Sequence, residues 1–308
     1  MISIVVISKD EPELDATLTA VPAMHAGEPV EVLVVDASGG HLDHLAAAHP
    51  RVRWQAFEPP PGVRVSIPHQ RNAGVRAASG DVVVFTDAGC RPEPGWLPAL
   101  LAPLRKEDED IVAGVATGPR DRPGLYDRDA VRPAMYLDEC PTINLAFRRS
   151  LFDAVDGFDE AFEYGSDVDF SWRVLDAGYR IRSAPDAVVV HDWGGRRRQV
   201  RRSYAYGKAR ARLYLKHRSR LPRLPTTEPM VVAYPIYLLG LPVALLASVA
   251  AGVSTAVPQW TILVLPGYLA LLAVPAWRNR RNGSARVVLD HLVYGAGVLA
   301  ELTRRRRR

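Results

Sequence analysis

The sequence predicts an α/β domain with a doubly wound sheet, followed by a carboxyl-terminal segment that is anchored in a membrane. Apolar runs in the first half alternate with helical patterns, which is typical of a sheet covered by helices on both faces. In the second half, no charged residue lies between Glu228 and Arg278. Soluble domains rarely contain such a gap, and it is long enough for two membrane spans and a turn.

The expected strands are short, continuous and rich in β-branched residues, as in buried parallel sheets. They begin at Ile2, Glu31, Val52, Asp81 and Asp110, and a last apolar run ends at His191. Helical patterns fall between them, at residues 14–21, 69–80, 95–105 and 165–178. In the last of these, Ser166 with Asp169 resembles a capping box, and Gly178 ends the helix.

The apolar gap is interpreted as two transmembrane helices, Met230 to Val253 and Trp260 to Trp277, joined by a polar turn. A buried helical hairpin in a soluble protein is the alternative. Arginines and lysines cluster before the first span and after the second, while the turn has none, so both ends are expected in the cytoplasm. The amino terminus lacks the basic start of a signal peptide, which places the first domain there too.

Four segments are therefore expected. They are an α/β domain at residues 1–195, a basic juxtamembrane helix at 196–228, two transmembrane helices at 229–277, and a basic cytoplasmic tail at 278–308. The arginines beside a membrane segment favour anionic lipid as their partner. Nucleic-acid binding is the competing interpretation of the same charge, but no recognition motif accompanies it. Cys90 and Cys140 have no metal-ligand spacing and are expected to be reduced thiols.

Asp87 is the most informative acidic residue, because it ends a strand that is expected to be buried on both faces. Ligands of α/β folds bind at such strand ends. A carboxylate there can hold Mg²⁺ or Mn²⁺, which take one or two protein carboxylates plus phosphate oxygens and water. The position two residues later, where a second carboxylate would complete the clamp, is Gly89.

Three further residues are ambiguous when each is considered alone. Asp36 ends the second strand, where an acid either binds a ribose or base edge or forms a turn. His191 follows the last strand, as a metal or phosphate ligand or as a structural histidine. Asp167 and Asp169 begin a helix, where the helix dipole alone would favour them. Residues two apart do not share a helix face, so only one can be a general base, and we favour Asp167.

Residues 1 to about 195 resemble a family 2 glycosyltransferase with the GT-A fold. The resemblance rests on ISIVVISKDEPELDATL, LVVDASGG, QRNAGVRAASGDVVVFTDAG, NLAFRRSLFDAVDGFDEAFEYGSDVDFSWRV and VVVHDW. The membrane hairpin is also similar to carboxyl-terminal segments of many such enzymes. By contrast, Gln199 and Arg202 match only the start of the Gln-x-x-Arg-Trp motif of processive synthases, because Ser203 replaces the tryptophan.

The resemblance implies a role for each candidate residue. Asp36 would contact the base or ribose of the donor, Arg71 and Asn72 would line the donor site, and Asp87 matches the first carboxylate of the Asp-x-Asp motif. Asp167 matches the base of the Glu-Asp motif, and His191 matches a late histidine that joins the metal in some members. For each of these residues the alternative role given above stays open.

Two departures from the family pattern affect the expected chemistry. Gly89 removes a direct metal ligand, so use of Mg²⁺ or Mn²⁺ rests on Asp87, His191, the diphosphate and water. Ser166 replaces the glutamate before Asp167, and losing that negative neighbour is expected to make Asp167 a weaker base.

The expected function is an inverting transfer of a sugar from a nucleotide-diphosphate donor to an acceptor hydroxyl at the inner membrane leaflet. A lipid-linked acceptor or a cell-envelope glycan would suit that position. The alternative is a catalytically impaired nucleotide-sugar-binding or scaffolding protein. The sugar, nucleotide and acceptor are expected to be selected by a long loop from Pro119 to Pro141.

Overall fold

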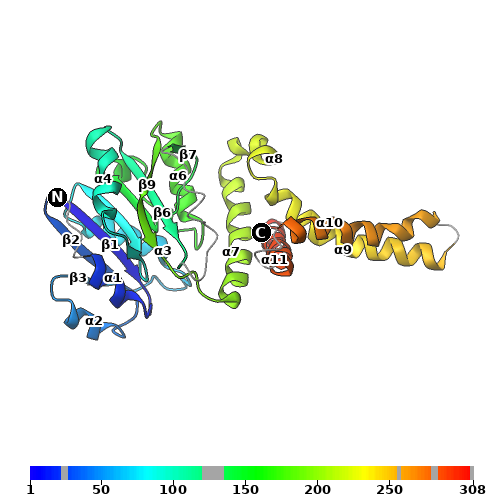
Figure 1. Ribbon diagram of the computed structural model, residues 1–308, viewed down its shortest axis with the longest axis horizontal. Coiled ribbons are helices and arrows are strands. Elements are labelled where there is room, and N and C mark those ends of the chain that lie inside the picture. Colours follow the sequence, from blue (N-terminus) through cyan, green and yellow to red (C-terminus); the bar gives the residue numbers. More distant parts are fainter. Residues whose placement is uncertain (22–26, 120–134, 255–257, 279–283, 306–308) are drawn as a thin grey trace. The chain divides into compact units, whose positions relative to one another are not determined.

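The computed structural model describes residues 1–21, 27–119, 135–254, 258–278 and 284–305. These residues form two compact units, Met1–Trp193 and Gly194–Arg308. The first is a sheet flanked by helices, and the second is helical (Figure 1). Much of the loop predicted from Pro119 to Pro141 lies outside the described residues.

The first unit is organised around four parallel strands. These are β1 Ile2–Ser8, β2 Val30–Asp36, β3 Arg53–Ala56 and β4 Val82–Asp87. Strand β1 lies between β2 and β4, and β3 pairs with the outer side of β2. The register sets Asp36 opposite Ser8 and Asp87 opposite Ile7. Both acids therefore reach the same edge of the sheet.

The rest of the sheet corrects the parallel arrangement that the sequence suggested. Strand β8, Asn144–Arg148, runs antiparallel between β4 and β6, which is Ile111–Thr117. Strand β9, Ile181–Val190, then pairs in parallel with β6. Two short strands, β5 Arg91–Pro92 and β7 Tyr136–Leu137, pair antiparallel with β9. The sheet is therefore mixed. The sequence did not show this, because a short apolar run indicates burial but carries no information on strand direction.

Helices cover both faces of this sheet, as the sequence predicted. Helices α1 Leu14–Ala20 and α4 Trp96–Lys106 share one apolar core with Ile4 and Val84. Helices α3 Ile67–Ala77, α5 Arg149–Ala154 and α6 Ser166–Asp176 share the other with Val5 and Phe85. Alternating strand residues therefore fill opposite cores. The short helix α2, Asp43–Ala48, lies between β2 and β3 in the chain.

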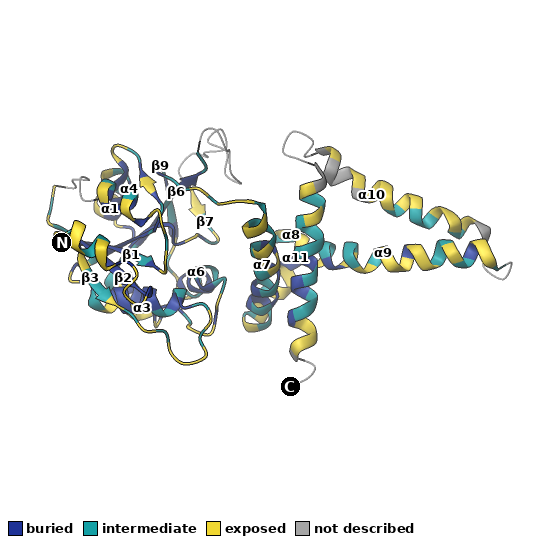
Figure 2. Cartoon of the chain, turned by 90° about the horizontal axis from the view of Figure 1, so that it is seen from below, coloured by how far each residue is buried: buried dark blue, intermediate teal, exposed yellow. Residues whose placement is uncertain are grey.

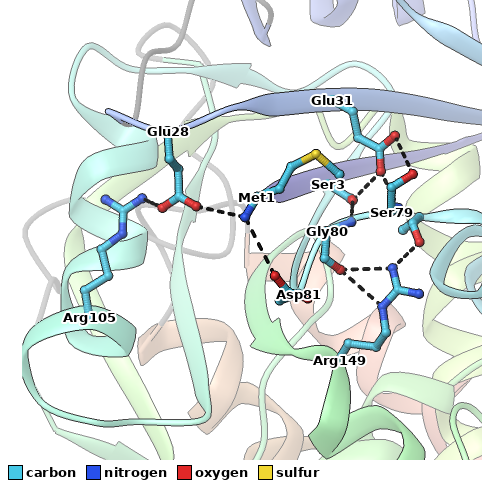
Figure 3. A network of polar contacts seen from close by, with 10 residues as sticks. Met1, Ser3, Glu28, Glu31, Ser79, Gly80, Asp81, Arg105 and Arg149 are labelled. Atoms are coloured by element: carbon cyan, nitrogen blue, oxygen red, sulfur yellow. Dashed lines mark hydrogen bonds and ion pairs between the residues drawn. The ribbon is translucent and has the colours of Figure 1, made fainter.

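The amino-terminal ends of β1, β2 and β4 are held by a polar network (Figure 3). Glu31 Oε1 accepts hydrogen bonds from Ser3 Oγ and from the Ser79 amide, both at 2.5 Å. Ser3 Oγ in turn accepts the Gly80 amide at 2.7 Å, and Arg149 donates to the Gly80 carbonyl. Burial alone would raise the pKa of Glu31, but these hydrogen bonds and the Arg53 charge lower it overall.

The second unit begins with helix α7, Arg196–Lys216, followed by η3 Arg218–Arg223 and α8 Leu224–Thr227. Residues 284–305, expected only as part of a basic tail, form the long helix α11. Helices α7 and α11 cross closely. A Cβ on Gly207 would come within 2.1 Å of the Tyr294 carbonyl, and one on Gly297 within 2.1 Å of the Tyr204 carbonyl. Backbone approaches this close require glycine on both helices.

Helix α9, Met230–Val253, is the one helix among the described residues that is long and apolar enough to cross a membrane. Its most apolar stretch has a mean hydropathy of 2.2, and most of its surface is not buried within the protein (Figure 2). The second predicted span is divided into η4 Gln259–Leu263 and α10 Val264–Arg278. Helix α10 has 15 residues, or about 22 Å, against about 30 Å of hydrocarbon. A hairpin of two full-length spans is therefore not confirmed.

Candidate active site

The candidate residues gather where β1, β2 and β4 end and where α6 begins. Asp36 and Asp87 end the strands on either side of β1. The spacing of neighbouring strands sets their backbones about 10 Å apart. Asp36 is buried, and its carboxylate accepts the Ser38 amide at 3.1 Å and Ser38 Oγ at 2.5 Å. Asp36 thus forms a turn in this structure, and its contact with a donor stays a prediction.

Arg71 connects the donor-side carboxylate to the start of α6. It lies on α3, which packs closely against the sheet. A Cβ on Gly74 would lie only 2.5 Å from the Val5 side chain, so this approach requires glycine. Its Nη2 is 3.9 Å from Asp87 Oδ1, and its Nη1 donates to Ser166 Oγ at 3.4 Å. The sequence did not predict this link, because Ser166 is 95 positions away from Arg71 and nothing local marks it as a partner.

Asn72, the next residue on α3, has its hydrogen bonds in another direction. Its Nδ2 donates to the Phe158 carbonyl at 2.8 Å and to Glu160 Oε1 at 2.9 Å, and its Oδ1 accepts the Phe158 amide at 2.9 Å. These bonds fix the loop that follows α5. The predicted contact of Asn72 with the donor stays a prediction.

The two aspartates that begin α6 have different environments. Asp169 is fully buried and accepts a hydrogen bond from Arg173 Nε at 2.9 Å. Asp167 accepts the neighbouring Val168 amide at 2.9 Å, and it forms no ion pair with another side chain among the described residues. The expected capping box is wrong. Gly165, with φ of 80°, is the N-cap residue, and the Asp169 carboxylate accepts a hydrogen bond from Arg173 instead of a backbone amide at the start of the helix.

The pKa of Asp167 depends on both its burial and the charges of its neighbours. Burial raises its pKa, while the positive charge of Arg71 opposes that rise and Glu139 adds to it. A raised pKa makes the ionised carboxylate a stronger base than an exposed aspartate. No role was predicted for Glu139, because it lies in the loop that was expected from Pro119 to Pro141.

The turn after β4 brings His191 beside Gly89 and Cys90. Gly89 has φ of +89°, and its amide donates to Thr17 Oγ1 at 2.9 Å. A Cβ at this position would lie 3.3 Å from Glu13 Cβ and 3.6 Å from the His191 ring. The missing carboxylate thus coincides with a backbone conformation that suits glycine.

Cys90 and Cys140 are free cysteines, and both are buried. Burial raises the pKa of each thiol to about 12, and for Cys90 the negative charge of Asp87 adds to this effect. The Cys90 sulfur lies 3.7 Å from His191 Nδ1. As a neutral thiol it is a poor ligand for Mg²⁺ or Mn²⁺.

The donor set fits a divalent cation that is shared with a substrate. Among the described residues, no three His, Cys, Asp or Glu side chains are grouped to hold a metal. Asp87 is 36% exposed and His191 adjoins the turn that follows it, so the two candidate ligands lie at the same end of the sheet. Mg²⁺ and Mn²⁺ complete their shells with phosphate oxygens and water. The residues present therefore suit an ion that is held mainly by a bound diphosphate.

Comparison with known proteins supplies relatives for both units. The profile described as glycosyl transferase family 2 matches residues 3–158, and the profile described as glycosyl transferase family group 2 matches residues 135–274. A pre-mycofactocin glycosyltransferase from Mycobacterium tuberculosis is 29% identical over 235 residues, 71% of this chain and 47% of that protein. Succinoglycan biosynthesis protein ExoA from Rhizobium meliloti is 29% identical over 171 residues, 52% of this chain and 47% of that protein. The chain spans about half the length of these curated relatives.

A solved structure shares the fold. It is a mannosyltransferase from Pyrobaculum calidifontis in complex with GDP-Man and Mn²⁺, with a TM-score of 0.66 and 19% identity. The similarity covers 98% of this chain and 86% of that one, so the GT-A architecture is shared. Since the first profile matches just over half of the sequence, this chain belongs to glycosyl transferase family 2.

Proposed function

We propose that this protein transfers a sugar from a nucleoside-diphosphate donor to an acceptor hydroxyl, with inversion at the anomeric carbon. The observation that carries the proposal is the link through Arg71, which joins Asp87 at the end of β4 to the start of α6, where Asp167 lies. Family membership and a sugar-nucleotide-binding structural neighbour support the same reaction class.

In this proposal, Asp167 accepts the proton of the acceptor hydroxyl as the oxygen attacks the anomeric carbon. The bond between that carbon and the diphosphate breaks on the opposite side, which inverts the configuration. Arg71 supplies a fixed positive charge near the departing diphosphate. Since Asp167 must be ionised, the rate is expected to fall as pH drops through its raised pKa.

Asp87 and His191 would hold Mg²⁺ or Mn²⁺, and such an ion would supply positive charge to the leaving diphosphate as a Lewis acid. The structural neighbour that binds GDP-Man also contains Mn²⁺, which supports this choice of metals. Asp36, Arg71 and Asn72 remain the proposed residues on the donor side.

We place the site at the inner leaflet of the cell membrane, in a multi-pass protein whose catalytic domain and carboxyl terminus are cytoplasmic. Helix α9 has the length and hydropathy of a span, and α10 would need its flanking residues to make a second one. The arginines of α7 suit anionic headgroups. A lipid-linked acceptor or a cell-envelope glycan fits this position, and a relative acting in succinoglycan biosynthesis supports an envelope glycan.

A nucleotide-sugar-binding protein without transfer activity is the second candidate. Gly89 and Ser166 favour it, because they stand where family motifs have carboxylates. The two candidates differ in turnover and agree in binding, so only a rate separates them.

The test measures nucleoside diphosphate released from UDP-, GDP- and dTDP-sugars by the full chain in detergent, with and without Mn²⁺, where water takes the place of the acceptor hydroxyl and the other product is the free sugar. We expect release from one donor class, and a loss of about 10²-fold or more in Asp167→Asn. Asp176→Asn makes the same charge change on the exposed last turn of α6 and should keep the wild-type rate. Retained turnover in Asp167→Asn would remove that residue as the base. Binding of a donor without release would favour the second candidate.

A further inference from the structure

Arg71 is a buried cation whose hydrogen bonds are incomplete. Only 7% of the residue is exposed, and its Nε has no hydrogen-bond partner among the described residues. Nη1 makes a long bond of 3.4 Å to Ser166, and the guanidinium carbon lies 5.7 Å from the centre of the Phe158 ring. Packing, more than hydrogen bonding, therefore holds the positive charge in place.

The one carboxylate in ion-pair distance of this guanidinium, among the described residues, is Asp87, at 3.9 Å from Nη2. That distance is too long for a hydrogen bond, so Asp87 Oδ1 keeps its lone pairs available. Two positions that could add negative charge nearby are occupied by Gly89 and Ser166. Asp87, the carboxylate that a divalent cation would use, is therefore the one in ion-pair distance of Arg71 within the described ranges, while Asp167 interacts with the same positive charge at longer range.

A divalent cation bound to Asp87 would lie close to this buried guanidinium. The two like charges repel, and burial reduces the screening that water and salt provide at a surface. A diphosphate brings negative charge to both cations at once and removes the repulsion. The ligand count agrees, because the protein offers no group of three acidic, thiol or imidazole ligands among its described residues.

We infer that Arg71 prevents a divalent cation from binding at Asp87 until a nucleoside diphosphate is present, so that ion and nucleotide bind together. The inference rests on the proposed donor site but not on sugar transfer. It assigns Arg71 as a positioning residue that sets the order of binding.

The experiment measures Mn²⁺ binding to the full chain in detergent by electron paramagnetic resonance of free Mn²⁺, first alone and then with UDP or GDP. Wild type should bind Mn²⁺ weakly alone and at least about tenfold more tightly with the preferred nucleotide, a range typical of outer-shell effects on metal sites. Arg71→Met should bind Mn²⁺ about tenfold or more tightly without nucleotide. Arg71→Lys keeps the charge and should bind as weakly as wild type.

Two controls assign the effect to this pair. Arg91 is an exposed arginine four residues after Asp87, and it pairs with Glu13. Arg91→Met removes this charge and should leave Mn²⁺ binding unchanged. Adding Asp87→Asn to Arg71→Met should abolish the gained affinity.

Equal nucleotide-free affinities of wild type and Arg71→Met would overturn the inference, as would wild-type binding that is tight without nucleotide or undetectable in every sample. If Arg71→Met loses cooperative unfolding, Arg71→Gln takes its place, because it also removes the charge while keeping a polar group near Ser166 Oγ, and the same outcomes apply. A protein that shows the expected Mn²⁺ pattern but releases no nucleoside diphosphate would contradict the proposed transfer and leave this inference standing.

Discussion

The polar groups at the two ends of strands β1, β2 and β4 differ in how fully they are hydrogen-bonded. At the amino end, Glu31 and its hydrogen-bonding partners form a closed network, and the amino-terminal ammonium group pairs with Glu28 at 3.2 Å (Figure 3). At the carboxyl end, the buried atoms Ser8 Oγ and Arg71 Nε have no partner among the described residues. Buried polar groups without a partner need an explanation, and these two adjoin the candidate site. In our proposal, the same strands contribute stability at one end and the donor site at the other.

The largest expected effect on stability separates the two aspartates of α6. Asp169→Asn should lower the free energy of unfolding of the first unit by about 3 kcal/mol, because Arg173 would keep a largely buried charge without its partner. Urea unfolding followed by tryptophan fluorescence measures this. Asp167→Asn is the matched comparison. It should leave stability unchanged or higher, because burial disfavours the ionised form of Asp167. Equal losses in both variants would contradict the division between a structural and a catalytic aspartate.

A smaller effect is expected at Gly89, on the functional end. Gly89→Ala should cost about 1–2 kcal/mol, because a side chain is forced into the left-handed region. The matched variant Gly80→Ala tests the other end, where a Cβ would lie 2.6 Å from the Met1 carbonyl and would disturb the polar network without any positive φ. Thermal unfolding measures both. We expect Gly89→Ala alone to weaken nucleotide binding, and a loss of binding in Gly80→Ala instead would break the comparison.

The smallest effect is expected at Glu31. Glu31→Gln should cost about 1 kcal/mol near neutral pH, because it removes a charged acceptor from a partly exposed network. The pKa of Glu31 is lowered in the folded protein, so its contribution is present above the unfolded pKa and disappears as pH falls through the folded pKa. Wild type and Glu31→Gln should therefore converge in stability under acid conditions. A difference that grows as the pH falls would contradict the lowered pKa.

The sequence predicted the features that depend on local pattern. Continuous β-branched runs gave β1, β2, β4, β6 and β9, and the acids at strand ends fell at one edge of the sheet. Strand β8 was not predicted, because its four buried residues before Arg148 form too short a pattern to show a strand, its partners or its direction. The contact between Arg71 and Ser166 was also inaccessible, since it joins distant helices through the fold.

Periodicity was least informative in the second unit. Helix α11 was expected as part of a basic tail, because the arginines near and beyond its two ends obscured the apolar stretch between them, which packs against α7 and α9. The second span was placed from composition alone, and the chain there divides into η4 and α10. Apolar composition predicts contact with lipid, but it does not set where a helix begins.

The central claim is that the donor binds at the carboxyl end of these strands, and a thermal shift by a nucleotide sugar with Mn²⁺ tests it most directly. We predict that Asp87→Asn loses most of the ligand-induced shift, measured from its own ligand-free melting temperature, which falls because Arg71 loses its nearest carboxylate. Glu31→Gln should melt at a lower temperature and keep the full shift. A full shift in Asp87→Asn, or its loss in Glu31→Gln, would contradict the account.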